Sequence, residues 1–315
     1  MKTRLAMLLG GLAVIAAAAF AVPASAQTYP VRPITFIVPW PGGGTTDIIG
    51  RLLAEAMSKE LGQPIPVVDR VGGGGALGTK QVFDAPKDGY TVLVTTSGNH
   101  VLTPITGNVG YKPDDFVGIG QISSRTLVLA TQGDKWKNVA DFIKDAKANP
   151  GKYTFGAVPN VLPYIVTAAF AKAAGIELTH VPQTGGATGV TGVLGGHLDL
   201  VPESLESMQQ YLKAGKMNAL VVFNDKRDPS APDVPTAKEL GFDVIGNPWT
   251  GLAVAKGTPP EIVEKLRAVM AKVAKDPAFI ALVEKSGASV DYLDGPSFTA
   301  LFTRDYEKFK AAMGK

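Results

Sequence analysis

Short apolar runs alternate with segments of helical periodicity along most of this chain. Residues 34–38 form a compact apolar run between prolines, and residues 90–94 form another after an Asp-Gly turn, so both predict buried strands. From Ile48 to Leu61, apolar residues instead recur three and four positions apart. This spacing predicts one buried face of a helix that ends at Gly62.

The alternation continues to the C-terminus. Further strands are predicted at 67–68, 126–130, 153–155, 178–181, 198–201, 220–223 and 252–255, and further helices at 76–83, 138–148, 164–174, 189–194 and 205–214, with three more beginning at Pro260, Pro277 and Ser297. Asn138 has Asp141 three residues later, which is the spacing of a capping box. The pattern is typical of the α/β class. We predict two lobes, each a mainly parallel sheet flanked by helices, with a ligand cleft between them at the carboxyl ends of the strands.

The first 26 residues have the pattern of an export signal. Lys2 and Arg4 precede an apolar stretch at 7–22, and Ala24-Ser25-Ala26 is a small-residue cleavage site. We expect cleavage after Ala26 and a soluble protein of the bacterial periplasm. The alternative is a membrane anchor, but Pro23 and the cleavage motif follow the apolar stretch directly.

Composition excludes several classes of function. The chain has no cysteine, and therefore no lipoprotein attachment site, disulfide or thiolate metal site. Its 31 basic and 28 acidic residues nearly balance, and loss of Lys2 and Arg4 would bring the balance closer still. The net charge therefore creates no strong electrostatic field that would attract nucleic acid or a membrane surface. Any preference for an anion must come from a local arrangement of residues.

The glycine-rich turn after the first strand is the strongest candidate for such a local site. Glycines at 42–44 let the backbone approach a ligand, and the N–H groups of the following helix favour an anion. Asp47 can pair with Arg51 along that helix. The alternative is a plain turn with a capped helix. The candidate ligand-binding residues here are Trp40, Pro41, Gly42, Gly43, Thr45, Thr46 and Asp47.

A second glycine-rich turn at 72–78 formally matches G-x-G-x-x-G. A dinucleotide site also needs an acidic residue at the end of the second strand, and Asp88 instead lies in a turn before its strand. The sequence Gly78-Thr79-Lys80 also departs from a P-loop. We therefore expect no nucleotide and no other cofactor.

Other predicted strands end in residues that can donate hydrogen bonds. In the first half of the chain the candidates are Ser97, Asn99 and His100, and in the middle they are Val158, Asn160, Gln183, Thr184, Gly185, Ala187, Thr188 and Glu203. The alternative for each is a solvated loop or a helix cap. Glu203 would repel an anion or receive a basic group of the ligand.

Catalysis has little support in the sequence. His100, His180 and His197 lack the spacing of a metal site, and no G-x-S-x-G elbow or other nucleophile–base pair occurs. We therefore expect a binding protein that holds no metal, and not an enzyme.

Five stretches of the chain together resemble the Bug family, the substrate-binding components of tripartite tricarboxylate transporters. The first combines residues 29–34 with Pro39, Pro41-Gly42-Gly43, Asp47 and Arg51. The others are the glycine loop at 67–78, the Asp-Gly-Tyr-Thr run at 88–91, the run Leu194-Gly195-Gly196-His197-Leu198-Asp199, and a late segment from Arg227 to Gly251.

The resemblance implies a two-lobed periplasmic binding protein of type II, which closes on a small carboxylate and passes it to a membrane permease. We predict lobe one at 27–125 plus 248–315 and lobe two at 126–247, and the return of the chain to lobe one is what the resemblance implies. We also expect a monomer. Trp40, Gln183 and the run Pro202-Glu203-Ser204 depart from the usual family residues, so the resemblance does not assign a ligand. A sensor module for a receptor kinase and an exported hydrolase remain alternatives.

Overall fold

The computed structural model of the chain describes residues 29–159, 161–286 and 288–314. The predicted export signal and its cleavage site at Ala26 lie outside these residues. From Arg32 onward the chain forms one compact unit. Within the described part of the chain, no helix combines the length and the apolar composition needed to cross a membrane.

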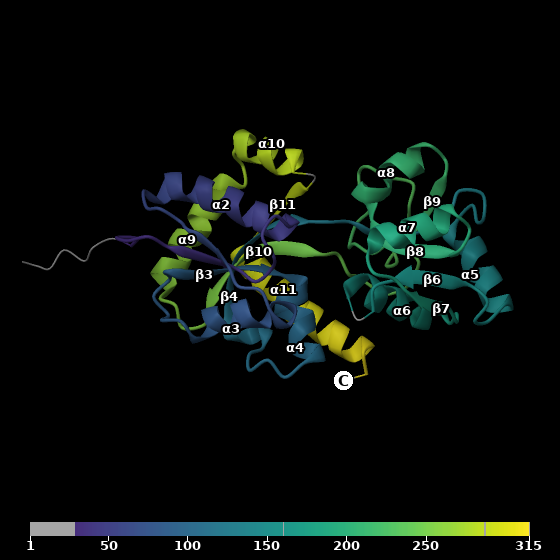
Figure 1. The fold of residues 1–315 in the computed structure, drawn as a ribbon, viewed down its shortest axis with the longest axis horizontal. Helices are drawn as coiled ribbons and strands as arrows, with labels where there is room; N and C mark the ends of the chain where they lie inside the picture. The colour runs from purple at the N-terminus through teal and green to yellow at the C-terminus, as the bar shows by residue number, and fades with distance from the viewer. Residues whose placement is uncertain (1–28, 160, 287, 315) are drawn as a thin grey trace, which may run out of the picture. The chain divides into compact units, whose positions relative to one another are not determined.

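Six strands form the first sheet, which runs in the order β11-β4-β10-β3-β1-β2. β1 pairs in parallel with β2 and β3, whereas β10 is antiparallel to β3 and β4, and β11 is antiparallel to β4. The strands are β1 (Thr35–Val38), β2 (Val67–Asp69), β3 (Thr91–Thr96), β4 (Phe116–Ser124), β10 (Trp249–Ala255) and β11 (Ser289–Asp294). The C-terminal strand β10 lies between β3 and β4 (Figure 1), and β11 forms one edge of the sheet. We call this sheet with its helices the first lobe.

Five strands form the second sheet, in the order β7-β6-β8-β5-β9. β6 pairs in parallel with β7 and β8, and β5 is antiparallel to β8 and β9. The strands are β5 (Leu127–Gln132), β6 (Thr154–Ala157), β7 (Thr179–Pro182), β8 (Leu200–Ser204) and β9 (Met217–Val222). This sheet and its helices are the second lobe.

The α/β class and the two sheets were predicted, but the prediction of mainly parallel sheets was wrong. Both sheets are mixed, because β10 enters the first sheet and β5 enters the second in the antiparallel direction. β4 and β11 were not predicted at all. The return of the chain to the first sheet through β10 agrees with the arrangement that the family resemblance implied, while the exact lobe boundaries remain a prediction.

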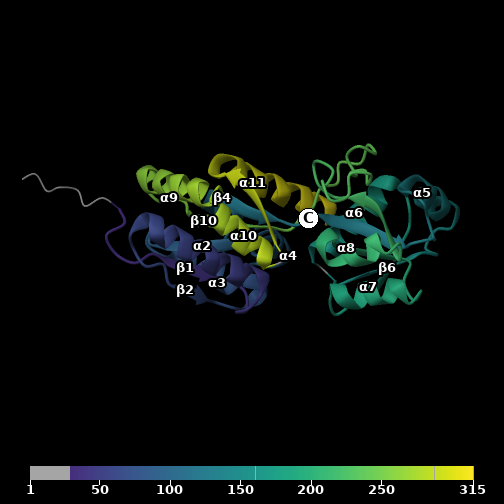
Figure 2. The same cartoon turned by 90° about the horizontal axis from the view of Figure 1, so that it is seen from above.

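Helices connect and cover the strands of both sheets (Figures 1 and 2). They are α2 (Thr45–Leu61), α3 (Ala76–Asp84), α4 (Thr103–Thr106), α5 (Val139–Ala148), α6 (Leu162–Ala174), α7 (Gly186–Leu194), α8 (Leu205–Lys213), α9 (Pro260–Val273), α10 (Pro277–Lys285) and α11 (Gly295–Ala312), with short turns η1 (Gly73–Gly75), η2 (Gly98–Leu102) and η3 (Pro113–Asp115). The predicted cap of α5 is confirmed, because Asn138 Oδ1 accepts a hydrogen bond of 2.9 Å from the Asp141 N–H.

Side chains alternate across the strands and fill a core on each face of the second sheet. Leu127 and Leu129 of β5 pack in one cluster with Phe142 of α5 and Phe170 of α6. Val128 and Ala130 point to the other face and pack with residues of α7 and α8. Side chains of β1 in the first sheet also alternate between two faces. Ile37 packs toward α3, whereas Val38 faces α2, where a Cβ on Gly50 would touch it. This burial fixes where each strand ends, and so where the loops that follow the strands lie.

Candidate functional site

Three loops of the first lobe converge around Trp40, at the ends of β1, β2 and β3. The Trp40 indole covers two glycines, since a Cβ on Gly98 would lie 3.1 Å from the ring and one on Gly75 would lie 3.5 Å from it. Gly75 also has φ +87, and its Cβ would lie only 2.5 Å from Asn99 Cβ. The close packing of the loops therefore requires glycine at 75.

A chain of hydrogen bonds joins the same three loops. The Trp40 Nε1–H donates to Thr96 Oγ1 (3.2 Å), and the Thr96 hydroxyl donates to Asn99 Oδ1 (2.8 Å). Asn99 Nδ2 then donates to Thr79 Oγ1 (2.8 Å), whose hydroxyl donates to the Gly75 carbonyl (2.9 Å). These contacts hold the loops in one arrangement. Sequence reasoning missed Thr79, which lies inside a helix and carries no sequence signal for this role.

Asp47 shapes the first glycine turn through its own hydrogen bonds. Its Oδ2 accepts from the Gly43 N–H at 2.7 Å, and its Oδ1 pairs with Arg51 Nε at 2.7 Å, which confirms the predicted pair. Burial raises the pKa of Asp47, but the bonds from Arg51 and Gly43 outweigh burial and leave the pKa below its usual value. Arg51 also reaches Asp69 at 3.2 Å. The carboxylate is therefore neutralised within the protein, and the Gly43 N–H is already used.

The first turn of α2 is left open toward a ligand. Its N-cap is Gly44, which supplies no side-chain cap, and Thr45 and Thr46 are partly exposed. The first N–H groups of a helix have no partner within the helix. Backbone N–H groups and two hydroxyls therefore remain available for an anion at this end.

Three residues predicted as ligand contacts lie in the interior instead. Ser97 is 4% exposed, and Asn99 and His100 have no exposed surface. The Asn99 side chain is used by the hydrogen bonds above. We expected these residues to line the site because they follow a strand rich in donors, but η2 turns their side chains into the lobe. In this structure they position the loops.

His100 lies among aromatic rings of three separate segments. Its ring centroid is 4.3 Å from that of Phe302, 5.0 Å from that of Phe116 and 6.2 Å from that of Trp249. Thr95 Oγ1 lies 2.9 Å from Nδ1. Burial lowers the pKa of His100 to about 3, and the opposing effect of the Pro113 carbonyl is smaller. The imidazole is therefore neutral and structural at neutral pH.

The second lobe presents the start of α7 after β7. Its N-cap is Gly185, again without a side-chain cap, and the Thr188 hydroxyl donates to the Gly185 carbonyl at 2.7 Å. Gln183 is partly exposed, while Thr184, Ala187 and Thr188 are exposed. Val158 is partly exposed at the end of β6, whereas Asn160 lies outside the described residues. The predicted residues of this lobe thus cluster at the ends of two neighbouring parallel strands.

Glu203 lies beside the same helix end. A Cβ on Gly186 would coincide with a Glu203 carboxylate oxygen, so the carboxylate rests directly on the first residue of α7. Its Oε1 accepts from the Ser204 N–H at 2.7 Å. Within the described part of the chain no cation pairs with Glu203.

Some helices of the structure begin with a side-chain cap and others do not. Asn138, Asp276 and Asp294 cap α5, α10 and α11 with their side chains. The helices that follow the parallel strands β1, β2, β6 and β7, which are α2, α3, α6 and α7, have no side-chain cap. The helices α4, α8 and α9 lack a side-chain cap too, so an uncapped start is compatible with anion binding but does not by itself mark a ligand-facing end.

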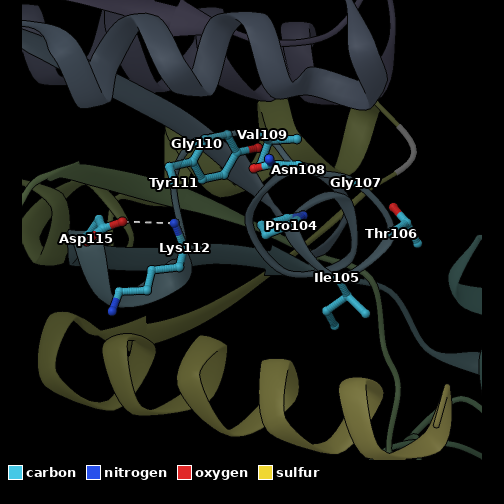
Figure 3. Close-up of a pocket in the computed structure, with 10 residues that line it drawn as sticks. All are labelled: Pro104, Ile105, Thr106, Gly107, Asn108, Val109, Gly110, Tyr111, Lys112 and Asp115. Carbon is cyan, nitrogen blue, oxygen red and sulfur yellow. Dashed lines mark hydrogen bonds between the residues drawn. The ribbon is translucent and has the colours of Figure 1, made fainter. Parts of the chain in front are cut away.

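Other features of the molecule do not form a site. His180 Nε2 lies 2.9 Å from the Ala157 carbonyl, and its ring packs on Phe155 and Tyr164. Among the described residues, no group of His, Asp or Glu side chains is arranged to hold a metal. A cavity of about 600 Å³ in the first lobe is lined by residues 104–112 and Asp115 (Figure 3), none of which belongs to the predicted site.

Comparison with solved structures places the fold among two-lobed solute-binding proteins. A TctC solute-binding protein from Polaromonas, solved without ligand, superposes with a TM-score of 0.87 at 32% identity, covering 91% of this chain and 99% of that one. A Rhodopseudomonas palustris protein with adipate gives 0.69 at 27% identity, and MatC of the same organism with malate gives 0.67 at 26%. Each comparison covers 90% of this chain, and 97% and 99% of the respective relative.

The sequence comparisons assign the family. The profile described as "Tripartite tricarboxylate transporter family receptor" matches residues 49–313. BugT of Bordetella pertussis is 32% identical over 283 residues, which is 87% of this chain and 86% of BugT. The chain belongs to the tripartite tricarboxylate transporter receptor family, and its relatives there are solute-binding receptors and not enzymes.

Proposed function

We propose that this protein captures a small carboxylate in the periplasm and delivers it to the membrane permease of a tripartite tricarboxylate transporter. In this proposal, the export signal is cleaved after Ala26, and the ligand lies between the two lobes as a monomeric receptor closes on it. Two solved relatives, one with adipate and one with malate, support a small acid as the class of ligand.

The observation that carries the proposal is the open end of α2. It combines free N–H groups, the Thr45 and Thr46 hydroxyls and a turn held in place by Asp47 and Arg51. Charge-assisted hydrogen bonds contribute about 1.5–3 kcal/mol each. A few of them, after the cost of desolvation, are enough for micromolar affinity, which corresponds to about −8 kcal/mol. The second lobe contributes the start of α7 and the loop at Gln183.

The proposed ligand set is smaller than the sequence alone indicated. From the first lobe it contains Trp40, Pro41, Gly42, Thr45 and Thr46, with Gly43 and Asp47 shaping the turn. From the second lobe it contains Val158, Asn160, Gln183, Thr184, Gly185, Ala187, Thr188 and Glu203. Asn99 and His100 are left out because they have no exposed surface, and Ser97 is almost as deeply buried.

Thermal unfolding against a panel of acids tests the proposal. The exported, processed chain is first stripped of bound ligand and then melted with dicarboxylates, tricarboxylates, aromatic acids and amino acids. A ligand at a hundredfold excess over its Kd stabilises the folded state by about 2.7 kcal/mol, so its melting temperature rises clearly. A panel in which no acid raises the melting temperature would contradict carboxylate capture.

Replacing Trp40 tests whether the three-loop cluster forms the site. Trp40→Ala removes the ring that covers Gly75 and Gly98 and the hydrogen bond to Thr96, so we expect Kd for the best acid of the panel to rise by about tenfold or more. Trp40→Phe keeps a ring but loses the N–H, and we expect a smaller rise. Calorimetric titration measures Kd, and circular dichroism checks that each variant is folded. An unchanged Kd in Trp40→Ala would show that the three loops of the first lobe do not form the ligand site.

A further inference from the structure

Glu203 places a negative charge where a ligand's second carboxylate would bind. The carboxylate lies at the end of β8, against Gly186 in the first turn of α7. That turn has no side-chain cap, so its N–H groups and positive helix end face Glu203. The anion-binding end of α7 therefore already has an anion beside it, supplied by the protein.

In the described part of the chain, backbone N–H groups and not a cationic side chain face the carboxylate of Glu203. Glu203 accepts a hydrogen bond from the Ser204 N–H, and among the described residues no lysine, arginine or histidine pairs with it. Asp199, which directly precedes β8, differs from Glu203 because it has a counter-ion in Lys135. A half-buried carboxylate without a counter-ion repels a second carboxylate and attracts a cation.

The first lobe differs because a cation lies at its glycine turn. Two carboxylates lie there, Asp47 and Asp69, and both pair with Arg51, while the N–H groups and hydroxyls at the start of α2 stay available. A carboxylate therefore binds more favourably at α2 than at α7. The two ends of the site differ in the charge that they accept.

We propose that the solute is zwitterionic, with a carboxylate bound at the start of α2 and a cationic ammonium group facing Glu203 at the start of α7. The inference rests on the proposed function, because it assigns the ligand class of the same site. It separates this chain from a receptor for dicarboxylates. Glu203 is then a specificity-determining residue that touches the ligand.

Acids of matched length test the proposal. Calorimetric titration at pH 7 compares, at each chain length from three to six carbons, the dicarboxylate, the ω-hydroxy acid and the ω-amino acid; succinate, 4-hydroxybutyrate and 4-aminobutyrate form one such set. α-Amino acids are included as a separate group. The protein is the exported, processed chain, as wild type and as Glu203→Gln, with Glu177→Gln as control. Glu177 is an exposed residue of the same lobe, so its variant makes the same change in charge away from the site.

We expect the wild type to bind an amino acid at least about tenfold more tightly than the dicarboxylate of equal length. Glu203→Gln keeps the size of the side chain and an acceptor for the Ser204 N–H but removes the charge. We expect it to bind the amino acid more weakly and the dicarboxylate more tightly, so that most of the preference is lost. Glu177→Gln should leave the preference intact.

Three results would overturn the proposal, and they differ in what they leave standing. If the wild type prefers the dicarboxylate and Glu203→Gln does not change the ratio, the zwitterion is excluded while carboxylate capture stands. If the hydroxy acid binds as tightly as the amino acid, Glu203 recognises a donor and not a cation. If no acid binds to either protein, the proposed function itself fails.

Discussion

The free energy of unfolding should fall steeply as the pH is lowered from about 6.5 to about 4.5, because His100 is buried in its neutral form. Burial lowers the pKa of His100 from 6.5 to about 3 in the folded protein. Between these values the unfolded chain binds a proton that the folded chain does not. Stability is therefore lost as the pH falls through this window, by up to about 1.4 kcal/mol per pH unit. The loss reaches roughly 2–3 kcal/mol at pH 4.5 and ends near pH 3.

Urea unfolding at several pH values measures this slope. His100→Gln removes the titrating ring, so its curve should be flatter than that of the wild type between pH 4.5 and 6.5, whatever its absolute stability. His197→Gln changes a histidine in an exposed turn and serves as the control. The carboxyls of Asp47 and Asp199, whose pKa values are lowered, lose their contribution only at more acidic pH. Parallel curves for the wild type and His100→Gln would contradict the prediction.

Gly75→Ala should destabilise the first lobe by about 2–4 kcal/mol and weaken ligand binding as well. Two costs add at this position. Gly75 has φ +87, a conformation that strains any L-residue, and the new methyl group would lie 2.5 Å from Asn99 Cβ. Asn99 holds the loops together through Thr96 and Thr79, so a shift there moves the Trp40 loop.

Gly43→Ala separates the two costs. Gly43 has φ +80, but no atom lies within 4 Å of a Cβ there, so only the backbone strain of about 1 kcal/mol is expected. Denaturant unfolding compares the two variants, and titration with the best acid of the panel compares their affinities. Equal destabilisation in both would show that the packing of Gly75 against Asn99 contributes nothing.

Local signals in the sequence predicted local features of the structure well. The Asp47–Arg51 pair and the Asn138 cap lie within four residues, and the spacing alone indicates them. The first residues of α9 and α10 were indicated by proline at 260 and 277. Each of these depends on backbone geometry that repeats in every helix, so no knowledge of distant residues is needed.

Features set by distant residues were missed. β4 contains Gly118 and Gly120, which weaken the strand signal in the sequence; a Cβ on Gly118 would lie 2.9 Å from the Thr299 hydroxyl, so the α11 packing requires glycine there. His100 was assigned to the ligand because of the donors around it, and Phe302 and Trp249, far along the chain, bury it. The strand directions were also beyond reach, since period-two patterns do not distinguish parallel from antiparallel neighbours.

The position of β10 determines the order in which the two lobes can be assembled during synthesis. β3 and β4 are made early, yet in the sheet they are separated by β10, which ends at Ala255. All five strands of the second sheet lie between Leu127 and Val222. They are therefore all synthesised before β10 of the first sheet. A polypeptide that ends before Trp249 therefore carries all strands of the second sheet, whereas its first sheet lacks β11 and also β10, the strand that joins β3 to β4. The N-terminal strands β1, β2 and β3 are therefore made first, yet they wait the longest for the neighbour that completes their sheet.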